Sequence, residues 1–187
     1  SNNFDLKLHG GLSGIDGIFV MESFLIEIVG QKKNIVVEVI YRSPNANVDA
    51  FVSKQHEIVQ KLSRENKLCY IMGDFNLNLL NHGNHLATGE FMDDLYSCTF
   101  FLLITLLSRI TSHSATLIDS ILMNHLTHNY LRAGLLLSDV SDHLPSSLSE
   151  ACSEAVFVRD KSSASMDKSL ENLQNVNCSH LSLQLCK

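Results

Sequence analysis

The sequence lacks the cysteine pattern of a disulfide-stabilised or zinc-binding domain. Its 187 residues contain five cysteines, an odd number, and no two of them are spaced as Cys-x-x-Cys. This count and spacing argue against a disulfide scaffold and against a zinc ribbon. They suit a reducing compartment, so we expect an intracellular location, either nuclear or cytoplasmic.

Long apolar runs and an excess of positive charge are missing as well. The longest apolar stretch, residues 100–107, is interrupted by Thr105 and is far too short to span a bilayer, so we expect no membrane role. Acidic residues number 20 against 14 Lys and Arg, which gives a net charge of −6. This balance weakens the case for a nucleic-acid partner, because duplex affinity comes largely from Lys and Arg on phosphates. It does not exclude one, since a site built of carboxylates lowers the net charge by itself.

The apolar content is sufficient for one folded domain. Hydrophobic residues make up 45% of the chain, whose length allows a sizeable core. A hairpin turn is expected at residues 30–33, and Asn47 is expected to cap a helix. Strands outnumber helices, which predicts a mixed sheet in a layered α/β arrangement. The predicted strands are residues 24–29, 34–41, 68–72, 117–123 and 135–137, and the predicted helices are residues 48–64 and 90–96.

Three acidic positions lie beside apolar runs. Gly73-Asp74-Phe75-Asn76 follows residues 68–72, Asp119 lies within residues 117–123, and Asp142-His143 follows the last predicted strand. A strand that ends in Asp delivers this residue to the rim of a sheet, where several strand ends can converge. Carboxylates, an amide and a histidine gathered there can hold a hard divalent metal and activate water. We therefore predict that the three positions meet in one site.

Each motif has a plainer interpretation when it stands alone. Gly-Asp-x-Asn after a strand is most often a turn, and Asp142-His143 alone could be a solvent-exposed turn. The ring of Tyr41 could simply cap the core. Asp119 is harder to explain in this way, because a buried carboxylate without a partner is costly. A partner such as His143 is the better account of that carboxylate.

The motifs, taken in order, carry a family resemblance. They resemble the last three motifs of the endonuclease/exonuclease/phosphatase superfamily, and residues 41–45 resemble the Tyr-x-x-Pro turn before them. The closer resemblance is to the apurinic-type endonuclease domain of non-LTR (LINE-like) retrotransposons, where strings similar to residues 109–119 and 141–145 occur in this order. The resemblance covers roughly residues 10–145, and four ordered motifs are far more specific than any one alone.

The resemblance implies a four-layer α/β sandwich that hydrolyses phosphodiesters with Mg²⁺ or Mn²⁺. The partner it implies is DNA, which is nicked so that a reverse transcriptase domain of the parent polyprotein can be primed. Carried over by position, Asp74 would orient or deprotonate the attacking water, and Asn76 would contact the phosphate. Asp119 would hold the ring of His143, which stabilises the charged transition state.

Four further residues complete the site that the resemblance implies. Tyr41 would contact the phosphate, and Asp142 would lie at or near the metal ion. Arg42 and Arg109 are candidates for binding substrate phosphate, although an exposed arginine is usually just solvated.

The sequence also departs from the family. The family's metal-binding Glu and an earlier Asn motif lie upstream of the region where this chain begins, and neither Glu22 nor Glu27 aligns with that Glu. After Pro145 the chain becomes serine-rich, with ten serines in residues 146–187. We therefore predict a partial, N-terminally truncated domain over residues 1–145, and a poorly ordered tail over residues 146–187.

Because the main metal ligand is absent, we expect weak or no nicking activity from this chain. Two alternatives stay open. The first is a non-catalytic relic, or a domesticated fragment that binds a partner. The second, which the retroelement-like string at residues 109–119 disfavours, is a phosphatase of the same superfamily.

Overall fold

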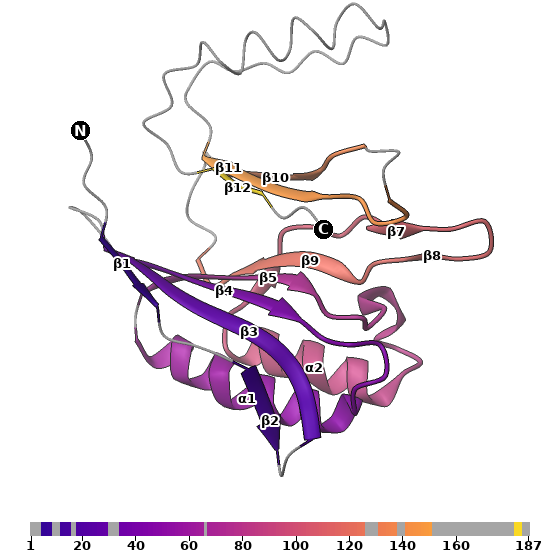
Figure 1. Ribbon diagram of the computed structural model, residues 1–187, viewed down its shortest axis with the longest axis horizontal. Coiled ribbons are helices and arrows are strands. Elements are labelled where there is room, and N and C mark those ends of the chain that lie inside the picture. Colours follow the sequence, from indigo (N-terminus) through magenta and orange to yellow (C-terminus); the bar gives the residue numbers. More distant parts are fainter. Residues whose placement is uncertain are drawn as a thin grey trace, which may run out of the picture.

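A seven-stranded mixed sheet forms the centre of the molecule (Figure 1). The computed structural model describes residues 5–8, 12–15, 18–29, 34–65, 67–125, 131–137, 141–150 and 182–184. The strands of the sheet are β1 (Asp5–Leu8), β2 (Leu12–Ile15), β3 (Ile18–Val29), β4 (Ile35–Tyr41), β5 (Leu68–Asp74), β6 (Phe101–Leu102) and β9 (Asp119–Met123). Their order is β1-β3-β4-β5-β9-β6, with β2 also paired to β3. Among these strands β4 and β5 are parallel and the other pairs are antiparallel, so the predicted mixed sheet is confirmed.

The predicted hairpin partners, β3 and β4, are antiparallel neighbours. The expected turn at residues 30–33 lies outside the described residues. β3 begins at Ile18, before the predicted start at Phe24, and neither β1 nor β2 was predicted. Both are four residues long, which is too short for a period of two to stand out.

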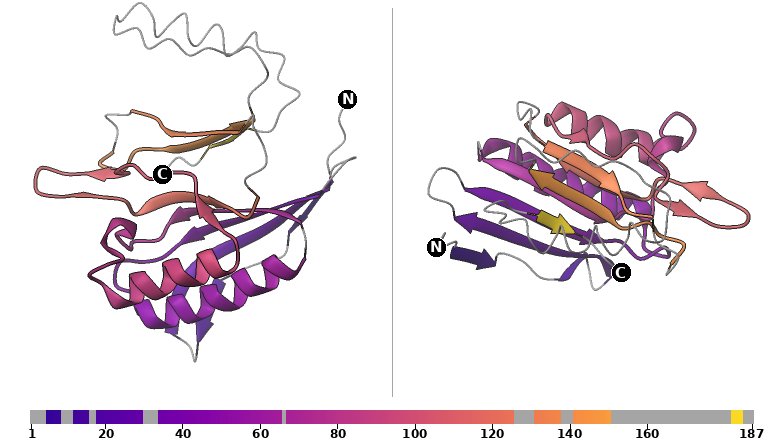
Figure 2. Two further views of the ribbon diagram at one scale, coloured as in Figure 1. Left: turned by 180° about the vertical axis from the view of Figure 1, so that it is seen from behind. Right: turned by 90° about the horizontal axis from the view of Figure 1, so that it is seen from above.

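Two helices cover one face of the sheet. α1 (Val48–Arg64) has the predicted bounds, and the Asn47 side chain accepts a hydrogen bond from the Ala50 backbone N–H at 2.8 Å. α2 (Leu86–Ser97) begins earlier than predicted, with His85 as its N-cap, and a short 3-10 helix, η1 (Leu79–Asn81), precedes it. Figures 1 and 2 show α1 and α2 side by side on one face of the sheet. Phe51 of α1 and Phe91 of α2 pack with ring centroids 5.6 Å apart.

A second sheet lies on the opposite face from the helices. It consists of β10 (Leu131–Leu135), β11 (Ser146–Glu150) and β12 (Ser182–Gln184), paired antiparallel (Figures 1 and 2). The described residues therefore form three layers (helices, sheet and sheet) of the predicted α/β sandwich. The prediction of a poorly ordered tail from residue 146 onward is wrong for Ser146–Glu150 and Ser182–Gln184. β11 pairs with β10 and with β12, and Leu148 is buried in the core. Residues 151–181 and 185–187 of the predicted tail lie outside the described residues.

The chain between α2 and β9 is mostly irregular. Its apolar segment forms only the edge strand β6, with Phe100 and Ile104 buried, whereas Leu106 is 67% exposed. Strands β7 (Arg109–Ile110) and β8 (Ala115–Thr116) then make a hairpin that projects from the body of the molecule (Figure 2). β9 starts at Asp119, so this residue stands at the beginning of its strand and not inside it as predicted.

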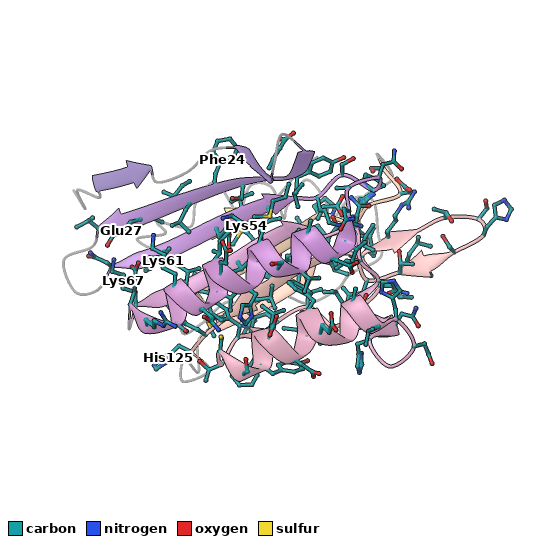
Figure 3. All side chains as sticks on the ribbon, turned by 90° about the horizontal axis from the view of Figure 1, so that it is seen from below. Phe24, Glu27, Lys54, Lys61, Lys67 and His125 are labelled. Carbon is teal, nitrogen blue, oxygen red and sulfur yellow. The ribbon has the colours of Figure 1, made fainter. Side chains whose placement is uncertain are left out.

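Gly73 is required by the close contact between β4 and β5. Its φ of +149° is rarely adopted by residues with side chains, and a Cβ atom there would lie 1.8 Å from the Ile40 carbonyl oxygen. The glycine therefore lets the two strands stay parallel and in register up to their last residues, Tyr41 and Asp74. At the other end of these strands, Lys67 Nζ lies 3.0 Å from Glu27 Oε1. Figure 3, drawn from the helix side, shows where these two labelled side chains lie.

The described helices include none with both the length and the apolar character needed to cross a membrane.

Candidate active site

Asp74, Asp119 and His143 converge at one rim of the central sheet. Asp74 ends β5 and Asp119 begins β9, and the antiparallel pairing of these strands places the two residues directly opposite each other. His143 comes from the segment before β11 and is held by a β-bridge to Arg109. One ligand atom from each of the three lies within 4.8 Å of the others. One residue from each of the three motifs is therefore found at the predicted meeting point, and from the third motif this residue is His143.

The predicted contact between Asp119 and His143 is also present. His143 Nδ1 lies 2.9 Å from Asp119 Oδ2, and the two side chains are 17% and 14% exposed. Burial, and then the neighbouring charge of Asp74, raises the pKa of Asp119, while the hydrogen bond from His143 opposes this shift. The contact sets the orientation of the imidazole ring, and the catalytic role of the pair stays a prediction.

Ser108 belongs to the site but was not predicted. Its buried Oγ accepts hydrogen bonds from the backbone N–H groups of Ile118 and Asp119, at 3.0 and 2.8 Å. Because two donors already face this oxygen, its own proton is directed to Asp119 Oδ2, 3.0 Å away. Asp119 Oδ2 thus binds both Ser108 and His143, and the carboxylate is fixed from two sides. A serine eleven residues before an aspartate gives no signal in a single sequence.

Asn76 fixes the carboxylate of Asp74. The Asn76 backbone N–H donates to Asp74 Oδ1 at 2.9 Å, in a loop where Asn76 has a positive φ of 47° that asparagine tolerates well. The Asn76 side-chain amide donates to the Arg42 carbonyl at 2.6 Å. The residue predicted to contact phosphate therefore already has a main-chain partner, and Asp74 itself is only 4% exposed.

Tyr41 and Arg42 follow each other at the end of β4 but occupy different environments. Tyr41 is in register with Asp74 and 37% exposed, so it lies at the rim and is not buried as a core cap would be. Arg42 is 2% exposed, and its guanidinium donates to three backbone carbonyls. Because the guanidinium is buried and already bonded to the backbone, a role in holding the loop is better supported than the predicted contact with substrate phosphate. Burial lowers the pKa of Arg42, and the charge of Asp74 opposes that shift.

Arg109 and Asp142 form an exposed ion pair beside the site. Arg109 Nε lies 2.7 Å from Asp142 Oδ2, and both side chains are 40% exposed. The hydrogen bond from Arg109 lowers the pKa of Asp142 below its usual range. Asp142 was predicted to lie at or near the metal, but it is not one of the three residues whose ligand atoms converge. The residues whose geometry could hold an ion are Asp74, Asp119 and His143, and the predicted place of Asp142 near the metal stays a prediction.

A divalent cation fits the chemistry of these three residues. Asp74 and Asp119 supply the carboxylate oxygens that hard cations prefer, and His143 supplies a nitrogen. Burial is the main cause of the raised pKa of Asp119, and repulsion by the charge of Asp74 adds to it. A positive charge between them would relieve this repulsion and stabilise both ionised forms.

The sequence and the structure differ in what they match among known proteins. No protein-family model and no curated protein sequence matches the chain. The structure is similar to the endonuclease domain of TRAS1, a telomere-specific non-LTR retrotransposon, with a TM-score of 0.54 and 12% identity over 76% of this chain and 64% of that domain. It is similar to an endonuclease/exonuclease/phosphatase family protein from Bacteroides thetaiotaomicron, with a TM-score of 0.54 and 13% identity over 78% of this chain and 65% of the other.

A third similar structure is the 3′ phosphatase NExo from Neisseria bound to a product DNA hairpin. Its TM-score is 0.54 and its identity 13%, over 78% of this chain and 70% of the phosphatase. At these identities the likeness shows the fold alone, so the chain has the α/β fold of the endonuclease/exonuclease/phosphatase proteins. It spans about two thirds of the length of these structures.

Proposed function

We propose that this chain carries a divalent-metal-dependent phosphodiesterase site of the DNA-nicking type found in retrotransposon polyproteins. The observation that supports this most is the convergence of Asp74, Asp119 and His143, with ligand atoms within 4.8 Å of one another. The shared fold is consistent with the proposal, since proteins of that fold include a retrotransposon endonuclease domain and a phosphatase bound to DNA.

Each converging residue has a separate task in the proposed hydrolysis. Asp74, held by the Asn76 backbone N–H, accepts the proton of the attacking water or orients that water toward the phosphorus atom. His143, held by Asp119, places a donor at the non-bridging phosphate oxygens, where negative charge builds up. Asp119 keeps one imidazole tautomer and favours the charged ring.

The carboxylates of Asp74 and Asp119 would also hold the metal ion, which when bound neutralises the phosphate and stabilises the leaving oxygen. His143 is not counted as a ligand here, because a charged imidazole donates from both ring nitrogens and has no lone pair for a metal. Mg²⁺ is the expected ion and Mn²⁺ the alternative. These residues provide two carboxylates, whereas hard cations take six or more oxygen ligands. We therefore propose weak activity for this chain, with DNA as substrate and a reverse transcriptase domain as partner in the parent polyprotein. Tyr41 and Arg109 are the proposed phosphate contacts.

A second candidate function is a non-catalytic fragment that binds a partner. Two contacts favour a binding fragment. In each of them a side chain that would have to face the substrate during nicking is bonded to another part of the protein. Asp142 is paired with Arg109, and the Asn76 amide is bonded to the Arg42 carbonyl. A phosphatase that shares this fold is a less favoured version of the same site chemistry.

The deciding experiment is nicking of supercoiled plasmid with Mg²⁺, with Mn²⁺ and with EDTA. The variants are His143→Ala and, as a matched control, His82→Ala at an exposed position. We expect slow metal-dependent nicking that His143→Ala abolishes and His82→Ala leaves unchanged. A folded chain that does not nick with either metal would contradict the proposal and favour the binding fragment.

A further inference from the structure

Arg42 is a buried charge near the candidate site, and three nitrogens of its guanidinium donate to backbone carbonyls. Its Nε donates to the Phe75 carbonyl, one terminal nitrogen to the Asn76 carbonyl and the other to the Ala46 carbonyl, each at 2.7 Å. The guanidinium carbon also lies 5.8 Å from the centre of the Phe51 ring on α1. One side chain thus connects the end of β4, the segment that leads into α1 and the loop after β5.

The main chain of Arg42 is bonded to the same loop. Its backbone N–H donates to the Asp74 carbonyl at 2.9 Å, and its carbonyl accepts from the Asn76 side-chain amide at 2.6 Å. Arg42 and the Asp74–Asn76 segment therefore share four hydrogen bonds, two of them from the guanidinium. This segment contains Asp74, which the proposed mechanism places at the attacking water, and Asn76, whose backbone N–H holds the Asp74 carboxylate.

The loop needs these bonds because its backbone is unusual. Asn76 has a φ of 47°, in the left-handed region, and the carbonyls of Phe75 and Asn76 both point to the guanidinium. Phe75 is fully buried, so water cannot easily replace a lost donor at its carbonyl. The Asn76 backbone N–H in turn holds Asp74 Oδ1, so a shift of the loop moves the carboxylate.

We infer that Arg42 is a positioning residue, which holds the Asp74–Asn76 loop in its working conformation and does not bind substrate. The inference rests on the proposed function for its catalytic consequence, but the positioning itself concerns only the fold. A planar guanidinium can reach three carbonyls at once, whereas a lysine ammonium is a compact charge that cannot reproduce this fork. The role is therefore specific to arginine.

The test compares Arg42→Lys with Arg42→Met, and uses Arg64→Lys on the exposed last turn of α1 as the matched control. The first measurement is hydrogen exchange of the Asn76 amide in the full chain, which needs no enzymatic activity. We expect exchange to be faster by about tenfold or more in Arg42→Lys, with the amides of α1 unchanged. The control should exchange as the unsubstituted chain does.

The second measurement is the kinetics of plasmid nicking. A loop displaced by about 1 Å should lower kcat by about a hundredfold in Arg42→Lys. KM should stay within about twofold, because no substrate contact is removed. A raised KM with unchanged kcat and unchanged Asn76 exchange would identify Arg42 as a substrate ligand and overturn the inference.

The two proposals can fail separately. If the unsubstituted chain does not nick DNA, the proposed function fails, and exchange alone decides the role of Arg42. Faster Asn76 exchange in Arg42→Lys then supports positioning, and unchanged exchange overturns it. Complete unfolding of both Arg42→Lys and Arg42→Met would show that the residue supports the whole fold and would overturn a local role.

Discussion

The polar groups of this protein fall into two kinds that differ in how firmly they are held. Two buried groups at the site have several partners each: Arg42 reaches three carbonyls, and the Ser108 hydroxyl makes three hydrogen bonds around Asp119. Exposed groups such as Arg109 and Asp142 form one ion pair that water surrounds. A buried polar group without partners is costly, whereas an exposed one can turn to solvent. The geometry of the site should therefore depend on the buried contacts far more than on the exposed pair.

The largest expected effect is the loss of the close contact at Gly73. Gly73→Ala adds a Cβ atom 1.8 Å from the Ile40 carbonyl oxygen at a φ of +149°, so β4 and β5 must separate. We expect the free energy of unfolding to fall by more than about 4 kcal/mol, or the chain not to fold. Urea denaturation measures this, with Gly83→Ala as the control, because a Cβ atom at Gly83 meets nothing within 4 Å. Equal midpoints for the two variants would contradict the interpretation.

A buried carboxylate should make stability depend on pH. Burial raises the pKa of Glu38 to about 7 from an ordinary value of 4.5, against the opposing hydrogen bond from Gln55. The unfolded chain therefore releases this proton at lower pH than the folded chain. The Glu38 contribution to stability is constant below about pH 4.5, falls as the pH rises toward about 7 and is level above it, a total loss of about 3 kcal/mol.

Glu38→Gln tests this dependence by removing the titrating group. We expect the variant to be more stable than the unsubstituted chain at pH 8, and the difference to shrink as the pH falls toward 4.5. Urea denaturation at several pH values gives both curves. Glu90→Gln, at an exposed position on α2, is the control and should leave the curve unchanged. A constant difference between Glu38→Gln and the unsubstituted chain at all pH values would refute the assignment.

A smaller effect is expected at Ser108. Ser108→Ala removes the acceptor of two backbone N–H groups and one donor to Asp119, which should lower the free energy of unfolding by about 2 kcal/mol. Nicking should slow by about tenfold, because the Asp119 carboxylate and the His143 ring become less well oriented. Ser112→Ala in the exposed hairpin should change neither quantity. A Ser108→Ala protein with unaltered stability would show that the network is redundant.

The smallest expected effect is at the exposed ion pair. Arg109→Ala removes the partner of Asp142, but both side chains are 40% exposed, so we expect no measurable change in the urea midpoint. If Arg109 contacts DNA as proposed, KM for plasmid should rise and depend less on salt concentration. A clear loss of stability would mean that this exposed ion pair contributes to the free energy of unfolding as the buried polar groups do, which would contradict the comparison.

Local features of the sequence predicted the elements that depend on neighbouring residues. α1 has the predicted bounds because Asn47 caps it and its apolar residues recur at helical spacing. Residues 68–72 form the body of β5 because a continuous apolar run before Gly-Asp is typical of a buried strand. The second sheet was missed at Ser146–Glu150, because its serines show no apolar alternation and its partners lie elsewhere in the chain.

In the candidate site, too, some features follow from local sequence and others depend on residues far apart in the chain. The order of the motifs in the sequence determined that Asp74, Asp119 and His143 belong together, and local periodicity determined the mixed α/β class. Only the tertiary structure decided that Asp142 pairs with Arg109, that Ser108 holds Asp119, and that Arg42 is buried under the loop it braces. The physical reason is that these contacts join residues far apart in the chain, or depend on which side of a strand end a side chain takes. Strand register and burial set both, and these arise only when the sheet has formed.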